Sequence, residues 1–164
     1  MKELNFKIRK AKGKDYFAVN SLFRESYARD QKNLPDTYSK IPRVVIDLET
    51  YSHTLNDKDF QIFVAEISGL VTGVIEISVE KASADCMIKP FTRVAVEELS
   101  VSKYYIGRGT EKALLDKAKN WAIKHKINEL TFMVYGYNKD LINICKDNNF
   151  EPYSIRFKHK TADK

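Results

Sequence analysis

The feature that most constrains the fold is a helical pattern enclosed by two apolar runs. Residues 110–126 carry apolar side chains at helical spacing, and we expect one buried or half-buried face. Its positions are Ala113, Leu114, Lys117, Ala118, Trp121, Ala122 and His125. The run 91–101 precedes this helix, and the run 130–135 follows it with apolar residues on both parities, as in a strand covered on both faces. This strand-helix-strand unit predicts a parallel pair joined by a crossover.

The first half of the chain predicts antiparallel strands. Residues 4–10 alternate apolar and polar side chains, as in a strand with one face in water. Residues 60–67 and 70–80 are extended runs, and Ser68 and Gly69 between them supply a tight hairpin turn. We therefore expect an α/β chain of the α+β kind. Its mixed sheet is antiparallel at first and has one parallel crossover in the C-terminal half.

Further helices and one more strand complete the expected secondary structure. Asp15 is expected to cap a helix with one apolar stripe. The stripe consists of Tyr16, Val19, Leu22, Phe23, Ser26 and Tyr27. A second helix is expected over 43–55 and a shorter one over 139–148. Residues 81–90 are expected to form a surface loop, and 153–159 a last alternating strand.

Length and the distribution of apolar and charged residues limit which classes of protein the chain can belong to. No repeat or Gly/Ser linker divides the 164 residues, so we expect one domain over 1–164. No apolar run approaches the roughly 20 residues that cross a bilayer, and the charged first residues do not form a secretory signal. The expected location is the cytoplasm, without a membrane partner.

Cys86 and Cys145 lie far apart and lack metal-ligand spacing, which predicts neither a metal site nor a disulfide.

The charge balance favours an anionic partner of small size. Lys and Arg outnumber Asp and Glu by 28 to 22, which gives a net charge of +6. These positive residues are spread along the chain without a dense block or interleaved aromatics. This distribution favours solubility or a phosphate-rich small molecule over a nucleic acid.

Two glycines stand where the predicted strand 91–101 passes through a loop into the helix that begins at Thr110. Gly107 and Gly109 leave backbone N–H groups accessible at a helix start, and such a concave, positive site suits a pyrophosphate. A turn that merely needs glycine would have the same composition. From the two glycines alone, both interpretations stay open.

The surrounding residues resemble the acyl-CoA signature of the GNAT superfamily of N-acetyltransferases. In that family a strand ending in Leu-x-Val, here Leu99 and Val101, leads into a loop written Gln/Arg-x-x-Gly-x-Gly/Ala. The loop positions fall on Ile106, Gly107, Arg108, Gly109, Thr110 and Glu111. Ile106 replaces the usual polar first residue. Glu111 replaces the usual small last residue, which places a negative charge near the phosphates.

The downstream spacing also resembles the family. Its members usually carry Asn after the next strand, then an aliphatic residue, a Tyr and a Gly-Phe pair at fixed distances. The corresponding residues here are Asn138, Leu141, Cys145, Asn149 and Phe150. Asn149 tolerates the left-handed conformation that ends a helix. Cys145 stands where the family carries the Tyr that protonates the leaving sulfur.

The resemblance implies a GNAT-like acyl-CoA N-acyltransferase fold and an N-acetyltransferase activity with acetyl-CoA as cosubstrate. Pantetheine would dock like an added strand on the backbone of Leu99, Ser100 and Val101. The loop 106–111 would hold the phosphates, and Asn138 is a further cofactor-binding candidate. The acceptor would be a primary amine of a small molecule, peptide or protein that the sequence does not identify.

Acyl transfer to an amine needs a group that takes the ammonium proton. The resemblance places Glu97 there, and Glu98 is the alternative. Neighbouring strand residues point to opposite faces, so only one should reach the acceptor side, although a bulge could exchange them. Cys145, Tyr135 or Tyr137 would protonate the leaving thiolate, or the thiolate would leave unaided.

The departures from the family pattern at Ile106, Glu111 and Cys145 motivate a second hypothesis. In it, the chain binds acyl-CoA with little or no turnover and serves as a sensor or interaction protein. Dimers are frequent in proteins of this kind, so a homodimer is one expected assembly, although the sequence shows no interface.

Overall fold

The computed structural model describes residues 6–85 and 87–161, so Leu4 and Cys86 lie outside the described residues. The chain divides into two compact units, residues 1–133 and 134–164. That both belong to one domain, as expected from the sequence, stays a prediction. Within the described residues, no helix combines the length and the apolar character that a membrane span requires.

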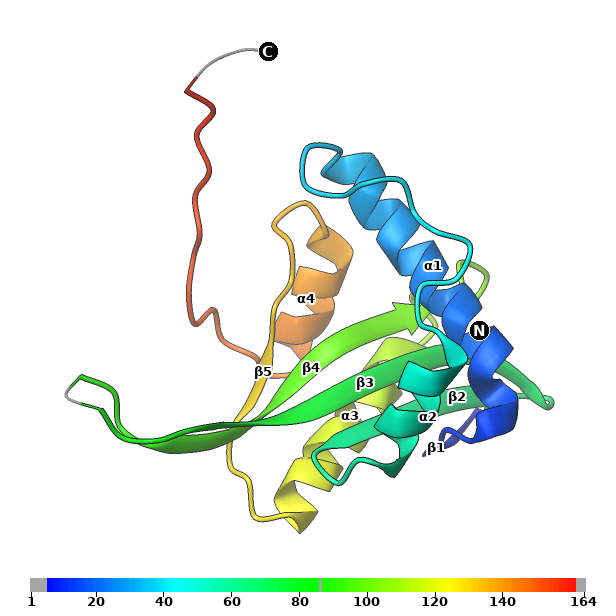
Figure 1. The fold of residues 1–164 in the computed structure, drawn as a ribbon, viewed down its shortest axis with the longest axis horizontal. Helices are drawn as coiled ribbons and strands as arrows, with labels where there is room; N and C mark the ends of the chain where they lie inside the picture. Colours follow the sequence, from blue (N-terminus) through cyan, green and yellow to red (C-terminus); the bar gives the residue numbers. More distant parts are fainter. Residues whose placement is uncertain (1–5, 86, 162–164) are drawn as a thin grey trace. The chain divides into compact units, whose positions relative to one another are not determined.

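A five-stranded sheet runs through the first unit in the order β1-β2-β3-β4-β5 (Figure 1). Its strands are β1 (Lys7–Lys10), β2 (Phe60–Ile67), β3 (Leu70–Ala82), β4 (Phe91–Val101) and β5 (Leu130–Phe132). The first four pair antiparallel, and β4 pairs with β5 in parallel. This confirms the predicted mixed sheet, and β2 and β4 have the predicted bounds.

The turn between β2 and β3 has the predicted geometry. Ser68 and Gly69 have φ angles of 49° and 83°. Both therefore occupy the left-handed region that a two-residue hairpin turn favours.

Helices cover both faces of the sheet, because neighbouring residues of a strand point to opposite sides. The helical elements of this unit are η1 (Gly13–Asp15), α1 (Tyr16–Asn33), α2 (Leu48–Asn56) and α3 (Thr110–Lys124). Val74 of β3 packs with α1 and α2 in one buried cluster. A Cβ on the neighbouring Gly73 would lie 3.1 Å from side-chain atoms of Leu114 and Thr110, so α3 covers the other face. Figure 1 shows α1 and α2 in front of the strands and α3 behind them.

The predicted helical faces are largely confirmed. On α1 the buried positions are Val19, Leu22, Phe23 and Ser26. On α3 every predicted face position is buried or half-buried except His125, for which the prediction is wrong. His125 follows the last helical residue, and its ring stacks on Trp121 with 3.9 Å between ring centroids. It therefore covers the helix end instead of entering the core.

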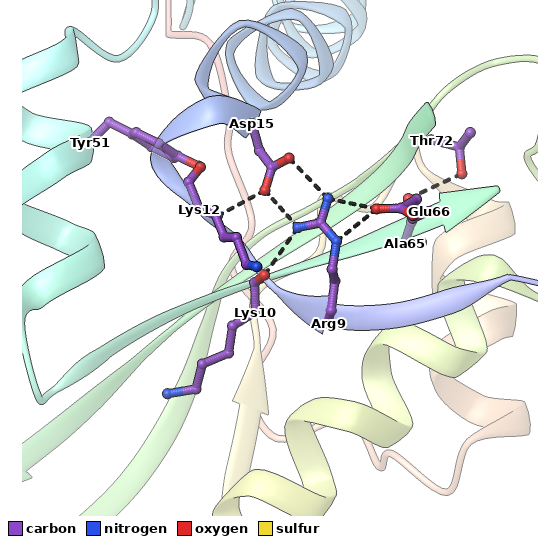
Figure 2. Close-up of polar contacts among 8 residues, drawn as sticks. All are labelled: Arg9, Lys10, Lys12, Asp15, Tyr51, Ala65, Glu66 and Thr72. Carbon is purple, nitrogen blue, oxygen red and sulfur yellow. Dashed lines mark hydrogen bonds and ion pairs between the residues drawn. The ribbon is translucent and has the colours of Figure 1, made fainter. Parts of the chain in front are cut away.

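Asp15 does not cap α1 with its side chain, contrary to the prediction. Its carboxylate accepts hydrogen bonds from the Lys12 N–H at 2.8 Å and from Arg9 at 2.6 and 3.0 Å. Arg9 also pairs with Glu66 at 2.7 Å, so one guanidinium on β1 joins two carboxylates (Figure 2). The Arg9 hydrogen bond holds the pKa of Asp15 below its usual range. The ion pair thus takes the oxygens that a cap would have used.

The prediction that the second helix begins at Arg43 is wrong, since α2 begins at Leu48. Asp47 caps it by accepting a hydrogen bond from the Thr50 N–H at 2.8 Å. The N–H groups of residues 45 and 46 donate instead to the Asn20 side chain of α1, at 2.9 and 3.2 Å. This tertiary contact keeps the preceding segment out of the helix.

The predicted buried strand over 130–135 is wrong in length and burial. β5 ends at Phe132, and its three residues are half-buried. It stands last in the strand order, so one of its edges has no strand partner among the described residues. A strand at the edge of a sheet is not covered like a central one.

The second unit contains α4 (Lys139–Asp147), which confirms the predicted short helix. Asn149 after it has φ 61°, the left-handed conformation expected there. The predicted strand over 153–159 is wrong, since residues 150–160 contain no regular secondary structure. Tyr153, Ile155 and Phe157 are 83%, 74% and 89% exposed. An alternating pattern forms a strand only where a second strand accepts its hydrogen bonds.

Candidate functional site

A bulge interrupts β4 at the candidate carboxylates. Glu98 lies opposite Glu76 of β3 and Val96 lies opposite Ile77, so Glu97 is an extra residue in the β3–β4 register. The bulge that could exchange the faces of the two glutamates is therefore present. A bulge of this kind bends the strand and changes where its side chains point.

The bulge directs both neighbouring glutamates to the α1 side of the sheet. Ser100 marks this side, because its hydroxyl donates to the backbone oxygen of Leu22 on α1 at 2.8 Å, and Glu98 shares its parity. The Glu97 carboxylate accepts a hydrogen bond from the hydroxyl of Ser78, which also lies on this side of the sheet. The expectation that the two glutamates point to opposite faces is therefore wrong, while which of them reaches the acceptor stays a prediction. The extra residue of the bulge breaks the alternation on which it depended.

Burial changes the protonation of this group of carboxylates. Burial, with a smaller contribution from the Glu97 charge, raises the pKa of Glu76 to about 7. Burial also raises the pKa of Glu98 to about 7, although a hydrogen bond to Ser26 of α1 partly opposes the shift. The pKa of Tyr27, next to Ser26, is raised to about 12 by burial and by the Glu98 charge. These residues form one electrostatically coupled cluster between α1 and the sheet.

Glu76, Ser78, Ser26 and Tyr27 were missed as site residues from the sequence. One signal was available, since Glu76 is a charged residue between Ile75 and Ile77 in an otherwise apolar run. A charge in the middle of a buried strand requires a partner or a function. The contributions of Ser26 and Tyr27 could not be anticipated, because they depend on how α1 lies across β4.

Beyond the bulge, β4 has an open edge within the first unit. β5 pairs with Val94, Ala95 and Val96 only. The next residues, 97–101, have β3 on one side and no strand on the other among the described residues of this unit. The side chains of Leu99, Ser100 and Val101 are buried. A ligand could pair with this edge only through its backbone, and as whole residues Leu99, Ser100 and Val101 are 4%, 1% and 4% exposed.

The loop after β4 has the glycine geometry that the sequence predicts. Gly107 and Gly109 have φ angles of 71° and 88°, in the left-handed region. A Cβ at either position would have no atom within 4 Å, so the backbone there is open to approach. Gly109 is the residue before α3, and the Ile106 and Arg108 side chains are exposed.

The first residues of α3 show one unused donor and one internal acceptor. Thr110 is fully buried, and its Oγ1 atom has no hydrogen-bond partner. Glu111 is 6% exposed, and its Oε1 atom accepts a hydrogen bond from the Gly107 N–H at 3.0 Å. One backbone donor of the loop is therefore already bound to a carboxylate of the chain.

Asn138 and Cys145 belong to the second unit. The Asn138 side chain caps α4 by accepting a hydrogen bond from the Leu141 N–H at 3.2 Å. Cys145 lies on α4 and is buried. The rings of Tyr135 and Tyr137 stack with 6.2 Å between centroids. The cofactor and acid roles implied for these residues stay predictions.

No family model matches the chain, and no curated protein matches it in sequence. Solved structures do match its fold. A mutant of the BH1408 protein from Bacillus halodurans has a TM-score of 0.90 and 13% identity, over 95% of this chain and 99% of that chain. An aminoglycoside acetyltransferase from an uncultured soil metagenomic sample, in complex with trehalose, has a TM-score of 0.72 and 15% identity, over 96% of this chain and 97% of that chain. A predicted acetyltransferase with acetyl-CoA from Clostridium acetobutylicum has a TM-score of 0.70 and 16% identity, over 95% of this chain and 96% of that chain.

These similarities span nearly the whole chain and confirm the GNAT-like fold expected from the resemblance. At 13–16% identity they describe the fold and not the acceptor.

Proposed function

Because the chain has the fold of the GNAT acetyltransferases, we propose that it transfers an acetyl group from acetyl-CoA to a primary amine. The observation that carries the proposal is the junction of β4 and α3, where an open strand edge leads to two left-handed glycines at a helix start. An extended arm can pair with such an edge, and a phosphate can accept hydrogen bonds from such a turn. Two solved structures with this fold are described as acetyltransferases, one of them with acetyl-CoA, which supports the proposal.

The junction fits the cofactor in two respects and opposes it in one. The backbone at Gly107 and Gly109 is open, and the Thr110 hydroxyl is a buried donor without a partner. Against this, the Gly107 N–H already binds Glu111. Residues 99–101 would hold the pantetheine arm, and the loop would hold the phosphates. Bound there, the carrier would supply an activated acetyl thioester.

Glu97 and Glu98 are proposed to prepare the amine, with Glu76 as a third carboxylate. An ammonium group is not nucleophilic, so a base must first remove its proton. The pKa of Glu98, raised to about 7, makes its carboxylate more basic than that of an ordinary glutamate. Glu97 is more exposed and would take the proton through water. The clustered negative charge favours a cationic acceptor such as a polyamine, an amino sugar or a lysine side chain.

The second unit is proposed to supply the proton for the leaving thiolate. Cys145 occupies the sequence position of the family's Tyr, and Tyr135 and Tyr137 carry phenols nearby in sequence. A buried thiol is a weaker donor than a phenol. Either tyrosine is therefore an alternative, as is unaided departure of the thiolate.

Gly109→Asp tests the cofactor site. The new carboxylate would stand at the phosphate position, so stabilisation by coenzyme A in a thermal unfolding assay is expected to disappear. Gly69→Asp is the matched control, because Gly69 has a similar φ of 83° and open space around it, in the β2–β3 turn. The control is expected to keep the response to coenzyme A. An undiminished response of Gly109→Asp would show that the loop is not the binding site.

The second candidate function is an acyl-CoA-binding module with little or no turnover. The Glu111 contact and the Cys145 substitution favour it, since both depart from the family pattern. Coenzyme A release with a panel of amines separates the two functions. Turnover that falls in Glu97→Gln or Glu98→Gln supports the enzyme, and the variant with the larger loss identifies the base. Cofactor binding without turnover on any amine supports the module.

A further inference from the structure

Glu111 is a buried carboxylate that the proposed reaction does not use. Its side chain turns back from the first turn of α3, and Oε1 accepts the Gly107 N–H at 3.0 Å. The positive end of the α3 dipole stabilises a negative charge at this position. The chain therefore presents its own anion to the backbone donors that the proposed function assigns to phosphates.

We propose that Glu111 is an internal competitor for the diphosphate of acetyl-CoA, and that the cofactor binds fully only after this carboxylate has left the Gly107 amide. The inference rests on the proposed function. One N–H group does not serve two acceptors at full strength, and two like charges in contact repel strongly. The residue would thus lower the affinity for diphosphate-containing carriers while leaving the open edge of β4 unaffected.

Open space lies next to the Gly107 amide that the Glu111 carboxylate binds. Glutamate has a flexible side chain, and the positions above Gly107 and Gly109 are free of other atoms within 4 Å. The neighbouring Thr110 hydroxyl has no hydrogen-bond partner, so the Glu111 carboxylate does not bind it. Thr110 is fully buried, so a phosphate could reach this donor only if the start of α3 rearranged.

A purely structural role for Glu111 makes the opposite prediction. If the carboxylate only shapes the loop, removing its charge would loosen the loop and weaken cofactor binding. If it competes, removing its charge would tighten binding. The sign of the change in affinity therefore separates the two roles.

Calorimetric titration of Glu111→Gln with coenzyme A tests the proposal. Glutamine keeps an acceptor for the Gly107 N–H and removes only the charge, so the loop should keep its shape. Asp116→Asn is the control, because it removes one charge from the exposed part of the same helix. Pantetheine is the second probe, since it has the arm of coenzyme A without the diphosphate.

The expected result is that Glu111→Gln binds coenzyme A about tenfold more tightly than the parent, the order of effect of removing one like charge. Its affinity for pantetheine should not change, and Asp116→Asn should stay within about twofold of the parent for both probes. If Glu111→Gln does not fold, Glu111→Ala, which empties the position, should show the same gain.

Equal or weaker binding of coenzyme A by the folded Glu111 variants would overturn the inference and leave the proposed function intact. An equal gain with pantetheine would also overturn it, because the effect would then not act on the diphosphate. If neither the parent nor any variant binds coenzyme A or pantetheine, the proposed function itself fails.

Discussion

β4 and residues 153–159 both have a strand-like sequence, but only β4 is a strand. β4 pairs with β3 along its length and with β5 over Val94, Ala95 and Val96. Residues 153–159 pair with no strand, and Phe157 is 89% exposed while Val94 is fully buried. Alternation shows that a segment can present one apolar face. A neighbouring edge that accepts its hydrogen bonds decides whether it becomes a strand.

The candidate site residues also fall into two sets, one placed by strand pairing and one known only from sequence spacing. The carboxylates, the open edge and the glycine loop belong to one unit whose sheet register defines their faces. Asn138 and Cys145 belong to the other unit, so their proposed roles depend on sequence spacing. The first set therefore supports a mechanism in structural terms, and the second supports it only through the resemblance.

The largest expected effect is that of crowding the contact between β3 and α3. In Gly73→Val, the new side chain would meet Leu114, Thr110 and Val101, since a Cβ alone lies 3.1–3.2 Å from their atoms. We expect the free energy of unfolding, measured with urea, to fall by about 2 kcal/mol. A Val introduced at the exposed position Ser154, in Ser154→Val, should change the free energy of unfolding by less than about 0.5 kcal/mol. Equal effects at the two positions would remove the contrast between the regions.

An intermediate effect is expected from the pH dependence of the half-buried carboxylates Glu76 and Glu98. In the folded chain the pKa of Glu76 and that of Glu98 are raised from 4.5 to about 7. The folded state therefore binds more protons than the unfolded state between these values, and stability falls as the pH rises from about 4.5 through 7. The double variant Glu76→Gln, Glu98→Gln should lose this decline. At pH 8 it should be more stable than the parent by about 1 kcal/mol, after discounting for solvent screening.

Urea unfolding from pH 4.5 to pH 8 measures this effect. Glu151→Gln is the control, since Glu151 is exposed and should give the parent's profile. Parallel profiles for the parent and the double variant would show that folding does not raise the pKa values of the two carboxylates.

The smallest expected effect is in the C-terminal segment. Phe157→Ser should change the free energy of unfolding by less than about 0.5 kcal/mol, because the ring is 89% exposed and loses no packing. Val94→Ser in β4 should cost about 2 kcal/mol, since it removes a buried apolar side chain and buries a hydroxyl. A large cost at Phe157 would show that the segment packs in solution. Sedimentation would then tell whether it does so within one chain or in a homodimer.

Much of the fold was predictable, because it depends on local patterns. The bounds of β2 and β4, the turn at Ser68 and Gly69, and the start of α3 followed from residue type and spacing. The loop conformation at Gly107 and Gly109 did too, since left-handed backbone favours glycine. Errors occurred where a contact with a residue outside the helix competes with a local preference. Arg9 takes the carboxylate of Asp15, and Asn20 holds the segment before α2.

The sequence by itself thus determined which segments can be helices and strands, where the chain turns left-handed, and which residues are chemically suited to the site. Those properties depend on side-chain volume, polarity and backbone freedom within a few residues. Only the tertiary structure decided that the bulge brings Glu97 and Glu98 to one side beside Glu76. It also decided that residues 153–159 are not a strand. The register between strands and the packing of α1 and α3 join residues far apart in the chain, and no local pattern encodes them.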